Sequence, residues 1–185
     1  MDSLDGYLTK LASSEPTPGG GSAAMVCGAL ACSLVAMVAR ICHAEGLAEE
    51  ADALREQMTV MREQDERAFQ AVVDAKGDAD AVQRALFGAA AAPLQGAGAA
   101  FEALKLCERA LALNNRHLIS DVGCAAEFAH AAVTACAYNV RVNHRYIKAS
   151  RERADVAAQR TALGSLEAQA RALYQRTADA VAGGL

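Results

Sequence analysis

The chain has 185 residues, a formal net charge of −4 at pH 7 and a sequence pI of about 5.6. Hydrophobic residues make up 53% and charged residues 22%, a balance that predicts one globular domain over residues 1–185 and excludes a disordered chain. There is no basic excess and no basic stripe with aromatic residues, so we expect no nucleic-acid partner.

Alanine dominates the composition with 45 residues, whereas aromatic residues make up 4% and tryptophan is absent. Alanine is the strongest helix former, and no segment alternates apolar and polar residues as a strand does. The sequence therefore predicts an all-α fold, an antiparallel bundle of about five to six helices. Because small side chains bury little area each, we expect long helices to dimerise as well.

The first half of the chain predicts three helices. A short helix over about Ser3–Ala12 is followed by a turn over Ser14–Gly21. A long apolar helix is expected over about Ser22–Ala44. Gly46 separates it from an amphipathic, charged helix over about Glu49–Ala75.

The second half predicts four more segments. A short helix is expected over about Ala79–Ala91, and a separate one over Pro93–Leu113, because proline suits the first turn of a helix. Ser120 is the predicted N-cap of a helix over about Asp121–Lys148. A polar helix over about Arg151–Ala182 is expected to end at the following glycine pair.

Several features predict a cytoplasmic protein. The N-terminal ten residues lack the basic region of a secretory signal. The uncharged run Ala23–Ala39 is slightly short for a membrane span of about 20 residues and is rich in small side chains, so we interpret it as a core helix and expect no membrane association. None of the six cysteines forms a C-x-x-C pair, which favours buried free thiols in a reducing compartment over a metal site.

The segment PTPGGGS, residues 16–22, is the first candidate site. Three glycines before a helix let the backbone approach a ligand closely, and the free N–H groups of the helix start attract anions. No Walker lysine follows and no strand precedes the segment. The alternative interpretation is a flexible turn in which Ser22 is only a cap.

The helix that begins near Ser120 is the second candidate site. At 100° per residue, Asp121 and Asn139 lie on one face of it, and Asn143 lies about 40° away. Buried amides and carboxylates must find hydrogen bonds, either in a ligand or in a neighbouring helix. The alternatives are that Asp121 only complements the helix dipole and that the asparagines join helices.

The remaining titratable groups give less direct signals. Glu127 and His130 point away from that face and are expected at the solvent or at another interface. The histidines show no metal-ligand spacing, so no metal is expected. His117 precedes Asp121 in the loop and is a proton-transfer candidate. Asp65 belongs to a charged helix segment, and periodicity alone leaves open whether it points inward.

A family resemblance joins these segments. The stretch PTPGGGSAAMVCGALACSLVAMVARI resembles the opening of the formiminotransferase-cyclodeaminase C-terminal family, which includes bacterial methenyltetrahydrofolate cyclohydrolases. Further matches follow in order: Asp65 with Ala68-Phe69, Ala92-Pro93-Leu94, Asn115, Ser120-Asp121-Val122, Asn139-Val140 and Asn143. The similarity spans about Leu4–Lys148.

The resemblance implies an all-α homodimer with a folate pocket beside the glycine turn and no cofactor other than the tetrahydrofolate substrate. It implies opening of the 5,10-methenyl bridge by water, or closure of 5-formiminotetrahydrofolate with loss of ammonia. Family members often carry a Thr-x-Gly-Lys-type segment where this chain has residues 40–46, and a Leu-Pro-Lys stretch where it has residues 76–81. Neither lysine segment is present, so a basic group that would hold an anionic tail or polarise the one-carbon unit is missing.

On this basis we predict a cyclohydrolase in which Asp121 moves the protons. The predicted substrate-binding residues are Pro18, Gly19, Gly20, Gly21, Ser22, Asn115, Ser120, Asn139 and Asn143. The alternatives are a cyclodeaminase, a folate binder without catalysis, and a purely structural helical oligomer.

Overall fold

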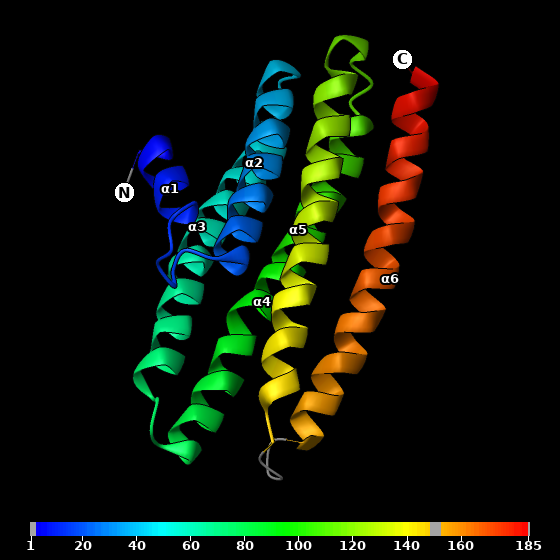
Figure 1. Ribbon diagram of the computed structural model, residues 1–185. Helices are drawn as coiled ribbons and strands as arrows, with labels where there is room; N and C mark the ends of the chain where they lie inside the picture. Colours follow the sequence, from blue (N-terminus) through cyan, green and yellow to red (C-terminus); the bar gives the residue numbers. More distant parts are fainter. Residues whose placement is uncertain (1–2, 149–152, 185) are drawn as a thin grey trace.

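The computed structural model describes residues 3–148 and 153–184, and these ranges contain α-helices, one short 3₁₀ helix and no strand (Figure 1). The helices are α1 (Leu4–Leu11), α2 (Gly20–Ile41), α3 (Glu45–Asp74), α4 (Ala79–Leu111), the 3₁₀ helix η1 (Arg116–Leu118), α5 (Ile119–Tyr146) and α6 (Arg153–Gly184).

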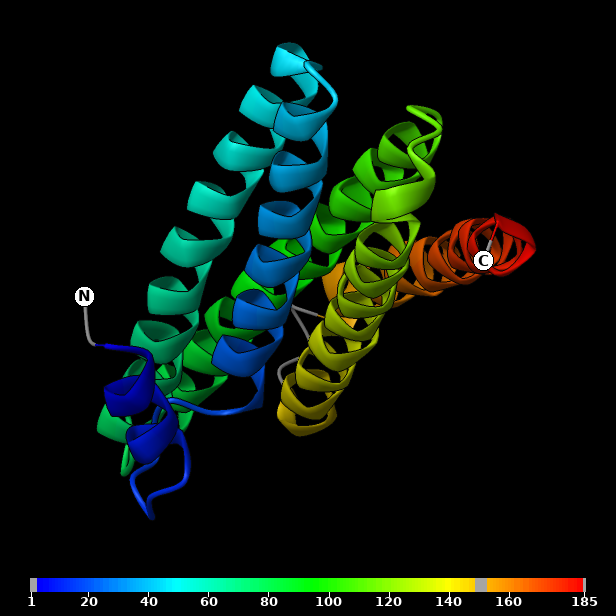
Figure 2. The same cartoon turned by 90° about the horizontal axis from the view of Figure 1, so that it is seen from above.

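Helices α2 to α5 alternate in direction and form a four-helix bundle, in which α2 packs on α3 and α5, and α4 packs on α3 and α5 (Figure 1). Helix α6 lies along α4 and α5 at one side of the bundle, and Figure 2 shows it inclined to the others. The short α1 lies beside the beginning of α2 and the middle of α3. The prediction of an all-α antiparallel bundle is confirmed.

Small residues fill the core and let the helices approach closely. Alanine is the commonest residue at the buried positions of α2, α4 and α5. Where larger residues intervene, glycine faces them: a Cβ on Gly28 would lie 2.7 Å from Met58 Cε, and one on Gly96 would lie 2.1 Å from Met25 Cε. Helix α2 is long and apolar enough to cross a membrane by length and composition, but it packs in this core and half of its residues are buried, as expected of a core helix.

The predicted break before Pro93 is wrong, because α4 runs unbroken through this residue. Proline lacks the N–H that would bond to the carbonyl oxygen of Ala89, four residues earlier. The side chain of Asn143 fills that vacancy from α5, with Nδ2 donating to the Ala89 oxygen at 3.0 Å. Tertiary packing thus offsets the lost helical hydrogen bond and keeps α4 continuous.

Two other predicted boundaries also differ. Helix α5 begins at Ile119 with Leu118 at the cap position, so Ser120 lies inside the helix, exposed, and is not its N-cap. The turn between α2 and α3 falls at His43, whose φ of 57° is left-handed, and Gly46 lies in the first turn of α3 instead of breaking the chain. The predicted start of the last helix at Arg151 lies outside the described residues.

The packing predicts a large cost for a truncated core leucine. Leu104 of α4 is fully buried, so Leu104→Ala should lower the free energy of unfolding by about 2–5 kcal/mol, through lost apolar contact and a cavity. Leu8 on α1 is 50% exposed, and Leu8→Ala should stay within about 0.5 kcal/mol. Urea unfolding followed by circular dichroism measures both; equal losses would contradict this assignment of the core.

Candidate active site

The glycine turn leads directly into α2 and leaves its first N–H groups without a local acceptor. Gly19 is the N-cap, in extended conformation, and has no side chain with which to accept a hydrogen bond. Gly20 and Gly21 form the first turn of the helix. Helix N-termini with such free donors and a positive dipole end require an acceptor from elsewhere or a ligand.

Asp65 of α3 supplies that acceptor. The backbone N–H of Ser22 donates to the Asp65 carboxylate. The approach is so close that a Cβ on Gly21 would lie 2.4 Å from Asp65 Oδ2. Glycine is therefore needed at position 21 for contact with the acid, and Asp65 acts as a cap contributed by a neighbouring helix.

The environment of Asp65 prepares it for proton transfer. Its pKa is raised to about 6, because burial and, to a smaller extent, the negative charge of Glu66 raise it more than the hydrogen bond from Ser22 lowers it. A carboxyl group with a pKa close to neutral can both accept and return a proton at physiological pH. Asp65 is thus the acid–base candidate of the described residues around the glycine turn.

Two amides of α5 lie opposite the glycine turn. A Cβ on Gly20 would lie 3.4 Å from Asn139 Nδ2, so this side chain faces the first turn of α2. Asn139 Nδ2 donates to the carbonyl oxygen of Ala135 at 2.9 Å, and Asn143 Nδ2 donates to that of Ala89 at 3.0 Å. Each Nδ2 group thus uses one of its two N–H donors, so each side chain can offer a ligand its second N–H and its Oδ1 acceptor.

These groups surround one small cavity of about 120 Å³. The glycine turn contributes Gly19, Gly20 and Gly21, the two asparagines come from α5, and Asp65 comes from α3. The remaining walls are Pro16, Thr17, Phe69, Ala89 and Val142. The cavity joins donors, acceptors and one titratable acid in a single place, as the chemistry of an amidine-like ligand would need.

Ser22 has a different role from the one its sequence suggested. Its hydroxyl is fully buried and donates to Glu66 Oε1 at 2.8 Å, so Tyr7 must be the donor in the 3.0 Å contact between the two hydroxyls. Arg62 Nη1 donates to the same Glu66 oxygen at 3.2 Å. The Ser22 side chain thus ties α1, α2 and α3 together, and only its backbone serves the site. Pro18 is buried and does not line the cavity.

Asp121 does not join this cavity within the chain. It precedes Asn139 by 18 residues on α5, which corresponds to about 27 Å along the helix. The helical periodicity places Asp121 and Asn139 on the same face of α5, but it does not bring them close together along the helix axis. The expected convergence of Asp121 with the asparagines and the glycine turn is therefore not found in the chain.

Other predicted residues lie at the same distant end as Asp121. Asn115 accepts from the backbone N–H of His117 at 3.1 Å and donates to Cys42 Sγ at 3.5 Å, so it caps η1 instead of lining the cavity. Ser120 and His117 are exposed there. Glu127, predicted to point away from the asparagine face, accepts a hydrogen bond from Tyr174 of α6.

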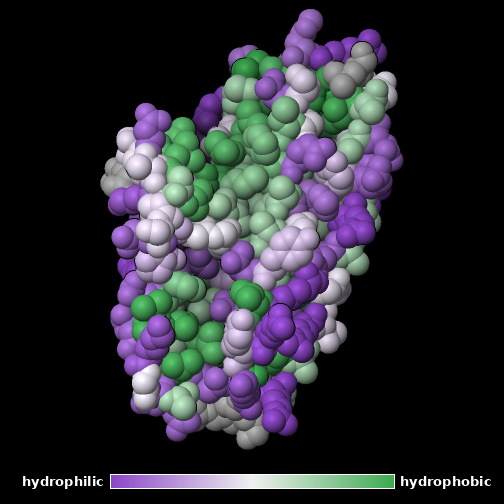
Figure 3. Space-filling view, in the orientation of Figure 1, coloured by the Kyte–Doolittle hydropathy of each residue, from purple (hydrophilic) through white to green (hydrophobic). Residues whose placement is uncertain are grey.

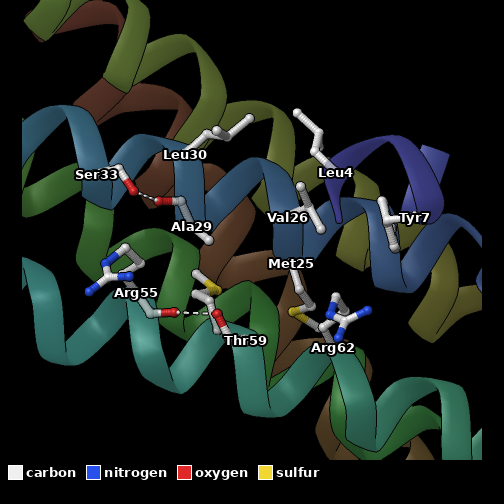
Figure 4. Close-up of a pocket in the computed structure, with 11 residues that line it drawn as sticks. Leu4, Tyr7, Met25, Val26, Ala29, Leu30, Ser33, Arg55, Thr59 and Arg62 are labelled. Carbon is white, nitrogen blue, oxygen red and sulfur yellow. Dashed lines mark hydrogen bonds between the residues drawn. The ribbon is translucent and has the colours of Figure 1, made fainter. Parts of the chain in front are cut away.

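A larger hollow of about 300 Å³ lies between α1, α2 and α3, on the other side of the Ser22 hydrogen bonds (Figure 4). Its walls are mostly apolar and include Leu4 and Tyr7 from α1 and Met25 and Leu30 from α2. Its two arginines are engaged in ion pairs within the chain, with Asp52 and Glu56 and with Glu63 and Glu66. It has no acid–base group positioned for chemistry and shares no wall residue with the cavity at Asp65, which is therefore the stronger candidate.

Comparison with known proteins gives consistent matches. The family model described as formiminotransferase-cyclodeaminase matches residues 3–162. The chain is 32% identical to a methenyltetrahydrofolate cyclohydrolase from Methylorubrum extorquens over 97% of its own length and 96% of that protein. It is also similar to the crystal structure of a formiminotetrahydrofolate cyclodeaminase from Thermotoga maritima, with a TM-score of 0.90 and 28% identity over 98% of this chain and 96% of the other.

The raised pKa of Asp65 predicts a specific dependence of stability on pH. Because the pKa is about 6 in the folded chain and 3.8 in the reference state, the folded state favours the neutral acid. The contribution of Asp65 to the free energy of unfolding is therefore greatest below pH 3.8 and is lost as the pH rises through 6. Urea unfolding of the wild type and of Asp65→Asn between pH 3.5 and 7 should show this fall only in the wild type; parallel curves would contradict it.

Proposed function

The chain belongs to the formiminotransferase-cyclodeaminase family, and from this premise we propose that it is a cyclohydrolase that converts 5,10-methenyltetrahydrofolate and water to 10-formyltetrahydrofolate. The single observation that supports this reaction best is the partly buried Asp65 carboxyl group, with its pKa near 6, against the first turn of α2. The 32% identical relative bears the name of this activity.

The first step is attack by water on the methenyl carbon. This carbon lies between N5 and N10 in an amidinium-like cation, so it is electrophilic without help from a metal ion. Asp65 accepts a proton from the water as the oxygen–carbon bond forms, and a neutral hydroxyl adduct results. A carboxylate with a pKa of about 6 is mostly ionised at pH 7 and is ready for this role.

The second step opens the ring. Protonated Asp65 returns its proton to N5 while the bond between N5 and the one-carbon unit breaks. The adduct hydroxyl loses its proton to solvent as the formyl C=O forms on N10, so the overall reaction releases one proton. One carboxyl group thus acts first as base and then as acid, which requires a pKa near the working pH.

The other cavity groups position the substrate. The Oδ1 atoms of Asn139 and Asn143 accept from N–H groups of the pterin, while one N–H of each amide is held by a backbone carbonyl and fixes its orientation. The N–H groups of Gly20 and Gly21 at the positive end of α2 stabilise the developing oxygen of the adduct. No cofactor beyond the tetrahydrofolate substrate enters this scheme.

Formiminotetrahydrofolate cyclodeaminase activity is the second candidate, because the similar Thermotoga maritima protein has this name. In that reaction N10 attacks the carbon of the protonated formimino group, Asp65 takes the N10 proton and returns it to the formimino nitrogen, and the bond between carbon and that nitrogen breaks to release ammonia. Ammonia release from 5-formiminotetrahydrofolate discriminates the two activities. A folate binder without catalysis, the third alternative, would give heat of binding in calorimetry and no turnover with either substrate.

We also propose a homodimer in the cytoplasm. Apolar side chains are exposed along two adjacent helices: Leu30, Met37 and Ile41 on α2, and Phe128, Tyr138 and Val142 on α5. Figure 3 shows apolar atoms spread over these helices in the upper half of the molecule. A broad exposed apolar surface supports a protein interface, and a second copy can bury the same surface by two-fold symmetry. All six cysteines are free thiols, which suits a reducing compartment.

The catalytic proposal predicts different outcomes for two aspartates. Asp65→Asn removes the proton acceptor and should lower kcat by roughly 10²–10⁴-fold, whereas Asp121→Asn at the far end of α5 should change it little. The assay follows the spectroscopic loss of methenyltetrahydrofolate, with uncatalysed hydrolysis subtracted. The wild-type kcat/KM should rise with pH through about 6. Full turnover in a folded Asp65→Asn protein, or loss only in Asp121→Asn, would reject Asp65 as the acid–base group.

The dimer proposal is tested by a charge on the exposed apolar surface. Leu30→Asp should shift the protein from dimer to monomer in sedimentation experiments, because an unpaired carboxylate would be buried at the interface. Val60→Asp is the matched control, since Val60 is similarly exposed, at 52%, on α3 outside this surface. A wild-type monomer, or dissociation by both variants alike, would reject this interface.

A further inference from the structure

The cavity at Asp65 is too small for a whole tetrahydrofolate. Its volume of about 120 Å³ is well below the roughly 300–1,000 Å³ of sites that enclose drug-sized ligands. The reacting N10 atom also carries the aminobenzoyl-glutamate arm, so this arm must leave the cavity close to the reacting carbon. The position of the arm is therefore a question that the geometry around the cavity can address.

A much larger groove continues from the same cavity. It has a volume of about 780 Å³ and lies between the end of α3, the beginning of α4 and the end of α5. Phe69, Val142 and Asn143 line both the small cavity and the groove, so the two are contiguous. The hollow beneath α1 shares no wall residue with the cavity and offers no such exit.

The walls of the groove are apolar and partly aromatic. Phe69 from α3 and Tyr146 from α5 line the groove and are 42% and 54% exposed, so both rings are accessible to a ligand. Val82 and Leu86 of α4 complete the lining between them. Figure 3 shows apolar atoms gathered in the lower part of the molecule, over the ends of α3 and α4.

Two charged residues, Lys148 and Asp78, line the groove. Lys148 lines it just beyond α5, and within the described residues its ammonium group forms no ion pair. Asp78 lines it too, but its carboxylate caps α4, accepting from the backbone N–H groups of Asp80 and Ala81 at 3.0 Å each, and the hydrogen bond to Ala81 holds its pKa below the usual range. Its charge is therefore already balanced by the N-terminus of α4.

We infer that this groove between α3, α4 and α5 binds the aminobenzoyl-glutamate arm of the substrate, with the aromatic ring between Phe69 and Tyr146 and a glutamate carboxylate at Lys148. The inference rests on the proposed function for the position of the pterin. A ligand that is aromatic near the cavity and anionic farther out matches the order of groups along the groove. Lys148 thus supplies the basic group that the missing lysine segments of the chain do not.

The test compares substrates with and without the glutamate. Lys148→Gln should raise KM for methenyltetrahydrofolate by roughly two- to fivefold, the range of an exposed ion pair, and leave kcat unchanged. It should not change KM for the methenyl derivative of tetrahydropteroic acid, which lacks glutamate. Lys76→Gln is the matched control, because it removes the same charge from the exposed turn nearby without lining the groove. Equal effects of Lys148→Gln on both substrates, or no effect on either, would overturn the inference.

A binding measurement without chemistry separates this inference from the proposed function. p-Aminobenzoyl-glutamate, titrated into the ¹⁵N-labelled protein, should shift amide resonances of residues 69–86 and 142–148, and Lys148→Gln should weaken it by the same roughly two- to fivefold. Binding there without cyclohydrolase turnover would sustain the groove and reject the activity. Turnover with no fragment binding, and with KM insensitive to Lys148, would sustain the activity and reject the groove.

Discussion

The whole arrangement depends on the contact between the Asp65 carboxylate of α3 and the first turn of α2. A helix that begins with glycines has no side chain of its own to cap it, and α3 supplies the missing acceptor. Burial at this contact raises the pKa of the carboxyl group, whereas the hydrogen bond from Ser22 itself lowers it. A helix end is capped and an acid–base group is buried at the same place, and the absence of a side chain at Gly21 permits both.

This double role explains the buried polar residues behind the contact. The hydroxyls of Tyr7 and Ser22, the carboxylate of Glu66 and the guanidinium of Arg62 form a chain of hydrogen bonds that fixes α1 and α3 against α2. Such a chain is stabilising only if every member is satisfied, and here each is. Rigid support of this kind is what keeps a reactive group in one geometry.

The sequence was sufficient to predict the helical fold and the proximity of two of its local features. The glycine turn and the two asparagines line one cavity, and both could be noticed because glycine before a helix and amides on one helical face are local patterns. Asp121 was expected to converge with these groups, but the structure does not bring it to them within the chain, because angular periodicity does not measure distance along an axis. A signal for Asp65 was present: it continues the apolar stripe Leu54, Met58, Met61 at helical spacing, so it is an acid at a core position. Local sequence patterns do not show that Asp65 contacts the first turn of α2, because that contact depends on how the helices pack.

Pro93 has a consequence for ligand recognition although it is remote from any proton transfer. Because proline has no N–H, the carbonyl oxygen of Ala89 lacks its usual helical donor and accepts from Asn143 Nδ2 instead. This hydrogen bond directs Nδ2 of Asn143 towards α4 and its Oδ1 away from α4. An ordinary residue at 93 would release the amide to flip, and aspartate at 143 would place an anion against a carbonyl. Pro93 of α4 thus helps to determine which donors and acceptors the cavity presents to a heterocyclic ligand.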